Sequence, residues 1–102
     1  MIKKVSFAEA KRLLDELPER VLLDVREEEE YITGHAVDAV LLPVDTLNDE
    51  TAMEAIPTLE TPVLVYCRSG FRSAVAALKL DELGYETIYD IGGLVGWPYG
   101  LV

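Results

Sequence analysis

Short apolar runs alternate with helix-like stretches along this chain, and that alternation restricts its fold more than any other feature. Runs of this kind predict strands that are buried on both faces. When helices separate such strands, the expected result is a parallel sheet covered by helices on each side. The expected strands are Val21–Val25, Val40–Leu42, Val63–Tyr66 and Thr87–Tyr89, and the expected helices are Phe7–Leu17, Glu27–Tyr31, Asn48–Ile56 and Ser73–Leu83.

Capping and breaking residues support several of these boundaries. Ser6 and Glu9 have the spacing of a capping box at the start of the first helix, and Pro18 lies just past its end. Gly84 suits the position that follows a helix C-terminus. The pair Gly92-Gly93 is expected to end the last strand.

Composition predicts a small acidic domain and excludes several kinds of partner. The length of 102 residues predicts one domain, residues 1–102, that buries its own core. The formal net charge is −10, and between Asp24 and Glu60 eleven acidic side chains accompany a single basic one, Arg26. Such a surface repels phosphate backbones and anionic lipid, so we expect neither nucleic-acid nor membrane partners. Most of these carboxylates are interpreted as a solvated face.

Cysteine and histidine are each present once, which limits the chemistry further. Cys67 has no partner for an intramolecular disulfide or a multi-cysteine metal site. With His35 as the single histidine, a zinc site is not expected, and no metal or cofactor is predicted. The first residues, Met1-Ile2-Lys3-Lys4, are not followed by the apolar core of a signal peptide. We therefore expect the protein in the reducing cytoplasm, where a free thiol persists.

Cys67 stands where the strand that ends at Tyr66 gives way to the helix that begins at Ser73. Ligands of parallel sheets bind at the carboxyl ends of strands, and backbone N–H groups at a helix start favour negative charge. A loop that curls at Gly70 can direct successive amides at the cysteine sulfur, as an anion-binding nest. This arrangement predicts a thiolate nucleophile that acts on an anionic substrate.

The loop also contains two arginines, Arg68 and Arg72, and its length discriminates between chemistries. An alternative interpretation is a buried structural cysteine with both arginines exposed to solvent. Cysteine phosphatases have five residues between nucleophile and arginine, whereas four lie between Cys67 and Arg72. The shorter cradle suits one extra sulfur atom on Cys67 better than a tetrahedral phosphate. An arsenate reductase is disfavoured as well, because a second, resolving cysteine is absent.

Further motifs occur in a definite order: Leu23-Asp24-Val25-Arg26-Glu27, Tyr31 with Gly34-His35-Ala36, Leu42-Pro43, Tyr66 through Ser73, Leu83-Gly84-Tyr85, Gly92-Gly93 and Trp97. Together they resemble the single-domain rhodanese family of thiosulfate or persulfide sulfurtransferases, over residues 5–102. The resemblance implies an α/β fold of three layers, with a central, mainly parallel sheet flanked by helices.

The resemblance also implies roles for the loop. Cys67 would take a sulfane sulfur and become a persulfide, with thiosulfate or a persulfide as donor and cyanide, a small thiol or a protein thiol as acceptor. The expected substrate-binding residues are Arg68, Ser69, Gly70, Phe71 and Arg72, whose backbone amides would stabilise the anionic sulfur. For either arginine, Arg68 or Arg72, the alternative is a structural ion pair with an acid.

Residues outside the loop are expected to have supporting roles. The resemblance assigns Asp24 and Arg26 to support of the loop, and the alternative for them is an ordinary strand-end ion pair. It places His35 in a structural motif away from sulfur transfer. An exposed Phe71 would favour an apolar acceptor or a protein partner. A sulfur carrier without turnover, or a protein-binding module, is the second functional hypothesis.

Overall fold

The computed structural model describes all 102 residues and contains one sheet of five strands in the order β1-β5-β4-β2-β3. Every pairing in this sheet is parallel, which confirms the predicted fold class. The strands are β1 (Ile2–Lys4), β2 (Val21–Asp24), β3 (Val40–Leu41), β4 (Val63–Cys67) and β5 (Ile88–Gly93). The helices are α1 (Phe7–Glu16), α2 (Glu28–Thr33), α3 (Asp49–Ala55) and α4 (Phe71–Glu82), with a 3-10 turn at Val44–Thr46.

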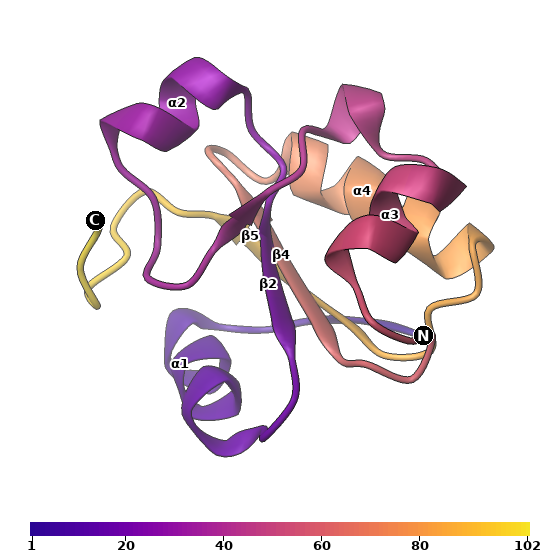
Figure 1. The fold of residues 1–102 in the computed structure, drawn as a ribbon. Coiled ribbons are helices and arrows are strands. Elements are labelled where there is room, and N and C mark those ends of the chain that lie inside the picture. The colour runs from indigo at the N-terminus through magenta and orange to yellow at the C-terminus, as the bar shows by residue number, and fades with distance from the viewer.

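Helices cover both faces of the sheet, with α1 on one face and α3 and α4 on the other (Figure 1). The central strand β4 is buried along its whole length, as its unbroken apolar sequence predicts. Successive side chains of a strand point to opposite faces. Val65 and Cys67 therefore pack in the core beneath α4, whereas Leu64 and Tyr66 pack in the core beneath α1.

The helices begin and end close to the predicted positions, with one informative exception. The Ser6 side chain accepts a hydrogen bond from the Glu9 amide, 3.1 Å away, and caps α1 as expected. Helix α4 begins at Phe71, two residues before the predicted start. It can do so because Gly70 adopts a positive φ of 104° and turns the chain sharply into the helix.

One prediction about the strands was wrong, and one strand was missed. Strand β5 continues through Gly92 and Gly93, which were expected to end it, and Gly93 pairs with Cys67. A β-carbon at Gly93 would lie 2.5 Å from the Arg68 carbonyl oxygen, so this glycine permits a close approach of backbones. Strand β1 was not predicted, since Ile2–Lys4 contains two exposed lysines and pairs only with β5 at the edge of the sheet.

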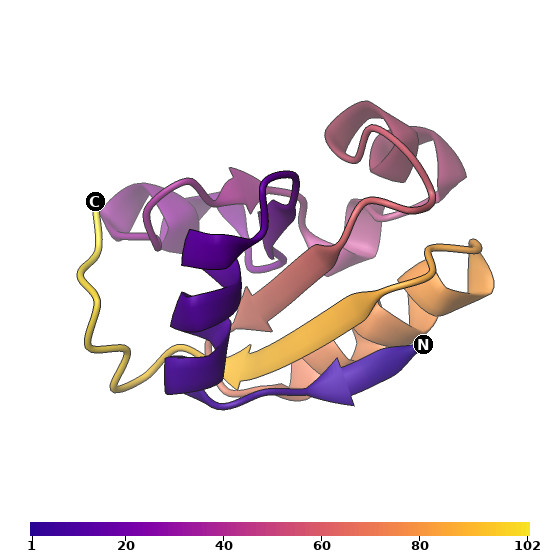
Figure 2. The ribbon, with the colours of Figure 1, turned by 90° about the horizontal axis from the view of Figure 1, so that it is seen from below.

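After β5 the chain runs past the carboxyl ends of the strands (Figure 2). An antiparallel bridge joins Leu101 to Ala36, and His35 exchanges backbone hydrogen bonds with Val102 at 3.1 and 2.8 Å. The C-terminal segment thus closes one side of the strand ends. None of the helices combines the length and apolar composition needed to cross a bilayer.

Gly93→Ala should lower the free energy of unfolding by about 1–3 kcal/mol, the usual cost of forcing atoms into a well-packed region. The new methyl carbon would meet the Arg68 carbonyl oxygen at 2.5 Å and the Ser69 Cα at 2.9 Å. Urea denaturation followed by circular dichroism measures the change. A variant as stable as the wild type would show that the loop can move away from β5 without cost.

Candidate active site

Cys67 is the last residue of the central strand, and its side chain is fully buried between the sheet and α4. The amide of Gly70 donates a hydrogen bond to Cys67 Sγ, with a nitrogen–sulfur distance of 2.9 Å. The Cys67 carbonyl accepts from the Leu94 amide at 3.0 Å, which fixes the strand end. The amide donor and the nearby helix N-terminus both place positive electrostatic potential at the cysteine sulfur.

The loop itself is shorter than the sequence suggested. Three residues, Arg68 to Gly70, separate the end of β4 from the first residue of α4, and Gly70 is the one whose amide reaches the sulfur. Ser73, predicted only as the start of the helix after Cys67, is fully buried in the first turn of α4. Its hydroxyl donates to the Gly70 carbonyl at 3.1 Å and holds the loop against the helix. The sequence signal for this contact was a small hydroxyl residue in the first turn of a helix, because such side chains often bond to nearby backbone groups.

Arg72 forms an ion pair with Glu30 of α2, the alternative left open for it by the sequence. Its Nη1 and Nη2 donate to Glu30 Oε1 and Oε2 at 2.6 and 2.9 Å. Glu30 also accepts from the Glu27 amide at 3.0 Å, within the capping box of α2. Hydrogen bonds from Arg72 are the main reason that the pKa of Glu30 falls to about 2. The pair joins the starts of α2 and α4.

Asp24 and Arg26 lie at the end of β2, beside the end of β4, and form a buried network. Arg26 Nη2 donates to Asp24 Oδ2 at 2.7 Å and to the Gly34 carbonyl at 2.7 Å. The Tyr66 hydroxyl donates to Asp24 Oδ2 at 2.7 Å and accepts from the Ala36 amide at 3.1 Å. Burial is the main reason that the pKa of Tyr66 is raised, and its hydrogen bond to Asp24 raises it further. The hydrogen bonding of Arg26 to Asp24 raises the pKa of Arg26.

This network contacts the residue before the cysteine rather than the cysteine itself. Tyr66 and Cys67 are consecutive in β4, so a fixed Tyr66 ring also fixes the backbone from which the cysteine side chain leaves. The contacts are therefore compatible with the predicted supporting role of Asp24 and Arg26, and they show that the strand-end ion pair is part of the same arrangement.

An open cavity of about 290 Å³ lies at the strand ends, beside the loop. Arg68 lines this cavity, is exposed, and has no hydrogen-bond or ion-pair partner for its side chain. Ser69 is exposed as well, and Phe71 points outward with 76% of its surface accessible. The residues lining the cavity are Arg26, Glu30, Thr33, Arg68, Leu94, Val95 and Leu101.

The apolar wall of this cavity was missed by sequence reasoning. Leu94, Val95 and Leu101 belong to the segment after β5, which carries no periodic pattern. The segment reaches the loop because Leu101 bridges to Ala36. No short-range signal in the sequence indicates that pairing.

Two other residues singled out by the sequence lie away from Cys67. His35 stacks on Tyr31 at a centroid distance of 3.7 Å, and its Nδ1 donates to the Tyr31 carbonyl at 2.8 Å. Trp97 packs edge-on against Phe7 and Tyr99. The contacts of His35 are compatible with the structural role that the resemblance implies for it.

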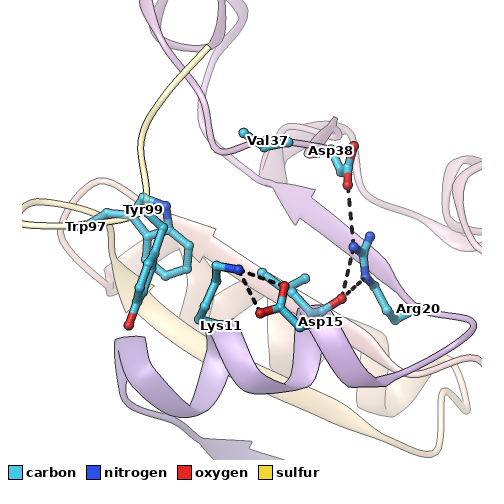
Figure 3. A pocket seen from close by; sticks show the side chains of 8 residues that line it. Lys11, Asp15, Arg20, Val37, Asp38, Trp97 and Tyr99 are labelled. Carbon is cyan, nitrogen blue, oxygen red and sulfur yellow. Dashed lines mark hydrogen bonds and ion pairs between the residues drawn. The ribbon is translucent and has the colours of Figure 1, made fainter.

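A second cavity, of about 210 Å³, lies on the α1 side of the molecule (Figure 3). Its charges are already paired within the protein: Lys11 Nζ lies 2.7 Å from Asp15 Oδ1, and Arg20 Nη2 lies 3.5 Å from Asp38 Oδ2. No residue of the cysteine loop lines it, so the cavity beside Arg68 is the one relevant to cysteine chemistry.

Comparison with known proteins places this geometry in a family. The family model described as the rhodanese-like domain matches residues 6–98. The chain belongs to the rhodanese family. The rhodanese fold is also found in the solution structure of the rhodanese-like domain of the Anabaena protein Alr3790, with a TM-score of 0.86 and 23% identity; the match covers all of this chain and 80% of that one.

Two curated relatives of this rhodanese-family chain have different names, and this chain spans very different shares of their lengths. The thiosulfate sulfurtransferase GlpE of Tolumonas auensis is 39% identical over 97 residues, which cover 94% of this chain and 88% of that protein. The tRNA uridine(34) hydroxylase of Erwinia tasmaniensis is 37% identical over 93 residues, which cover 86% of this chain. The chain spans only 26% of the length of the hydroxylase.

Asp24→Asn should lower the free energy of unfolding by about 3–5 kcal/mol, because it leaves the guanidinium of Arg26 buried without a counter-charge. Asp24 is fully buried and the Arg26 side chain is 12% exposed. The matched control is Asp15→Asn in the exposed Lys11–Asp15 pair, which should cost less than about 1 kcal/mol. Equal effects of the two substitutions in urea denaturation would contradict the structural importance of the Asp24 network.

Acid should selectively remove the stability that comes from the Glu30–Arg72 pair. The pKa of Glu30 is lowered from 4.5 to about 2, so the native state holds this carboxylate deprotonated more strongly than the unfolded chain does. The contribution is complete above about pH 4.5 and disappears as the pH falls toward about 2. Wild type and Glu30→Gln should therefore differ in urea stability at pH 6, and the difference should shrink below about pH 4.5 and vanish only near pH 2. A difference independent of pH would contradict this prediction.

Proposed function

We propose that this rhodanese-family chain is a sulfurtransferase that carries sulfane sulfur as a persulfide on Cys67. The observation that carries the proposal is the 2.9 Å hydrogen bond from the Gly70 amide to Cys67 Sγ, at the start of α4. An anionic sulfur at this position is stabilised both before and after it gains a second sulfur atom. The name of the GlpE relative, a thiosulfate sulfurtransferase, supports the same activity.

The transfer occurs in two displacement steps. With thiosulfate as donor, the Cys67 thiolate attacks the outer sulfur, the sulfur–sulfur bond of thiosulfate breaks, and its electron pair leaves with sulfite. The product is a Cys67 persulfide anion. Cyanide or a thiolate then attacks the outer sulfur of the persulfide and restores the Cys67 thiolate. The covalent intermediate predicts ping-pong kinetics.

Residues around the cysteine have separable roles in this proposal. Gly70 and the first amides of α4 stabilise the sulfur anion, and Ser73 keeps the loop against the helix. Arg68, which lines the open cavity, attracts the anionic donor. Because Cys67 is fully buried, the segment Arg68–Gly70 has to open around Sγ to admit the donor sulfur.

The loop supports sulfur transfer over phosphate transfer. Ser73 stands where the longer phosphatase spacing would place an arginine, and its side chain is buried against the loop backbone. A phosphoryl group would find Arg72 bound to Glu30 at both terminal nitrogens. One sulfur atom is smaller than a phosphoryl group and therefore suits a loop of only three connecting residues, Arg68 to Gly70.

A sulfur carrier that exchanges with protein partners is the second candidate function. Phe71 is 76% exposed at the start of α4, and Val95 and Leu101 add exposed apolar surface to the cavity rim. Apolar surface beside a reactive group suits a protein donor or acceptor.

We place the activity in one domain, residues 1–102, in the cytoplasm, with neither nucleic acid nor membrane as partner.

Intact-mass measurement after incubation with thiosulfate tests the first candidate. The wild type should gain the mass of one sulfur atom, cyanide should remove it, and Cys67→Ser should gain none. A chain that gains sulfur from a protein persulfide but never from thiosulfate would favour the carrier. Hydrolysis of an aryl phosphate that Cys67→Ser abolishes would overturn both candidates.

A further inference from the structure

Arg26 and Arg68 line the entrance cavity, and Arg72 binds Glu30, which lines it too. Two of these three arginines are neutralised. Arg26 is held by Asp24, and Arg72 donates from both terminal nitrogens to Glu30. Arg68 alone has no acidic partner. The unpaired positive charge at this entrance therefore comes from Arg68, and a paired arginine that lost its carboxylate would add to it.

Glu30 is well placed to control that charge. Its carboxylate lines the entrance cavity together with Arg26 and Arg68, while both of its oxygens accept from Arg72. The Glu27 amide holds Oε1 from the other side at 3.0 Å, so the carboxylate is fixed in place. The pKa of about 2 keeps Glu30 ionised at neutral pH.

We infer that Glu30 is a specificity-determining residue that, by neutralising Arg72, favours sulfur donors of one negative charge, such as small alkyl persulfides, over the thiosulfate dianion. This inference rests on the proposed sulfur transfer through Cys67. Glu30 acts on the donor through the field at the entrance rather than by contact with the reacting sulfur atoms.

The chemistry of the two donors is otherwise the same. With an alkyl persulfide anion, the Cys67 thiolate attacks the terminal sulfur, the sulfur–sulfur bond of the donor breaks, and its electron pair leaves on the alkyl thiolate. One negative charge enters and one leaves, whereas thiosulfate brings two and sulfite removes two. The Coulomb energy of a donor at the entrance scales with its charge, so a change of one unit at Glu30 affects thiosulfate twice as strongly.

The test compares the second-order rate constants with which thiosulfate and 2-hydroxyethyl persulfide load sulfur onto Cys67. Glu30→Gln keeps the size of the side chain and its ability to cap α2, but it releases the charge of Arg72. We expect the ratio of the thiosulfate constant to the persulfide constant to rise about 3- to 10-fold. The rise should shrink in high salt.

This ratio separates electrostatic selection from a merely structural role. Any change in the reactivity or packing of Cys67 alters both rate constants by the same factor, so it leaves their ratio unchanged. Glu29→Gln, on the same helix and exposed, makes the same change in net charge without contacting Arg72, so it should leave the ratio within about 2-fold of wild type. The double variant Glu30→Gln/Arg72→Gln removes one charge of each sign and should return the ratio toward the wild-type value.

The variant Arg68→Gln gives a second measurement of the same ratio. It should fold normally, because Arg68 is exposed and unpaired. Removing this free cation should lower the same ratio by about 3- to 10-fold. A wild type that accepts sulfur from neither donor overturns the proposed function and this inference together. A wild type that loads from both donors, with the ratio unchanged in Glu30→Gln, overturns the inference alone, whatever the result for Arg68→Gln.

Discussion

The burial of β4 on both faces is the constraint on which the rest of this structure depends. A strand in this position sends consecutive side chains into opposite cores. Tyr66 therefore enters the α1 core, where its hydroxyl joins Asp24 and Arg26, and Cys67 enters the α4 core beside the helix start. The alternation of side chains along β4 thus places the supporting network and the reactive sulfur on opposite faces of the sheet, at consecutive residues.

The loop that follows Cys67 is held by neighbours on three sides. Gly93 of β5 allows the Arg68 carbonyl to approach its backbone, Ser73 bonds to the Gly70 carbonyl, and the Arg72–Glu30 pair fastens α4 to α2. These contacts bring the Gly70 amide to the sulfur. The same Arg72–Glu30 pair neutralises Arg72 near the entrance, so in our proposal one interaction sets both the loop geometry and the donor preference.

Several features were predictable because they depend on residues close in sequence. The buried strands, the helix that follows Cys67 and the cap at Ser6 are signalled by local composition and spacing. The missed features are non-local. Strand β1 is short and polar, and its order comes from pairing with β5; the early start of α4 depends on how Gly70 turns the chain. The continuation of β5 through Gly93 depends on what lies opposite it.

By itself, the sequence determined the fold class and the position of a lone cysteine between a buried strand and a helix, because hydrophobic pattern and turn chemistry act over a few residues. It also contained the length of the segment from Cys67 to Arg72, on which the proposal of sulfur transfer over phosphate transfer is based. Only the tertiary structure decided that Arg72 pairs with Glu30, that Arg68 is the free cation, and that the C-terminal segment forms the apolar wall of the entrance. Residues 30 and 72 are far apart in the chain, and the contact between α2 and α4 exists only once the sheet brings the strand ends together.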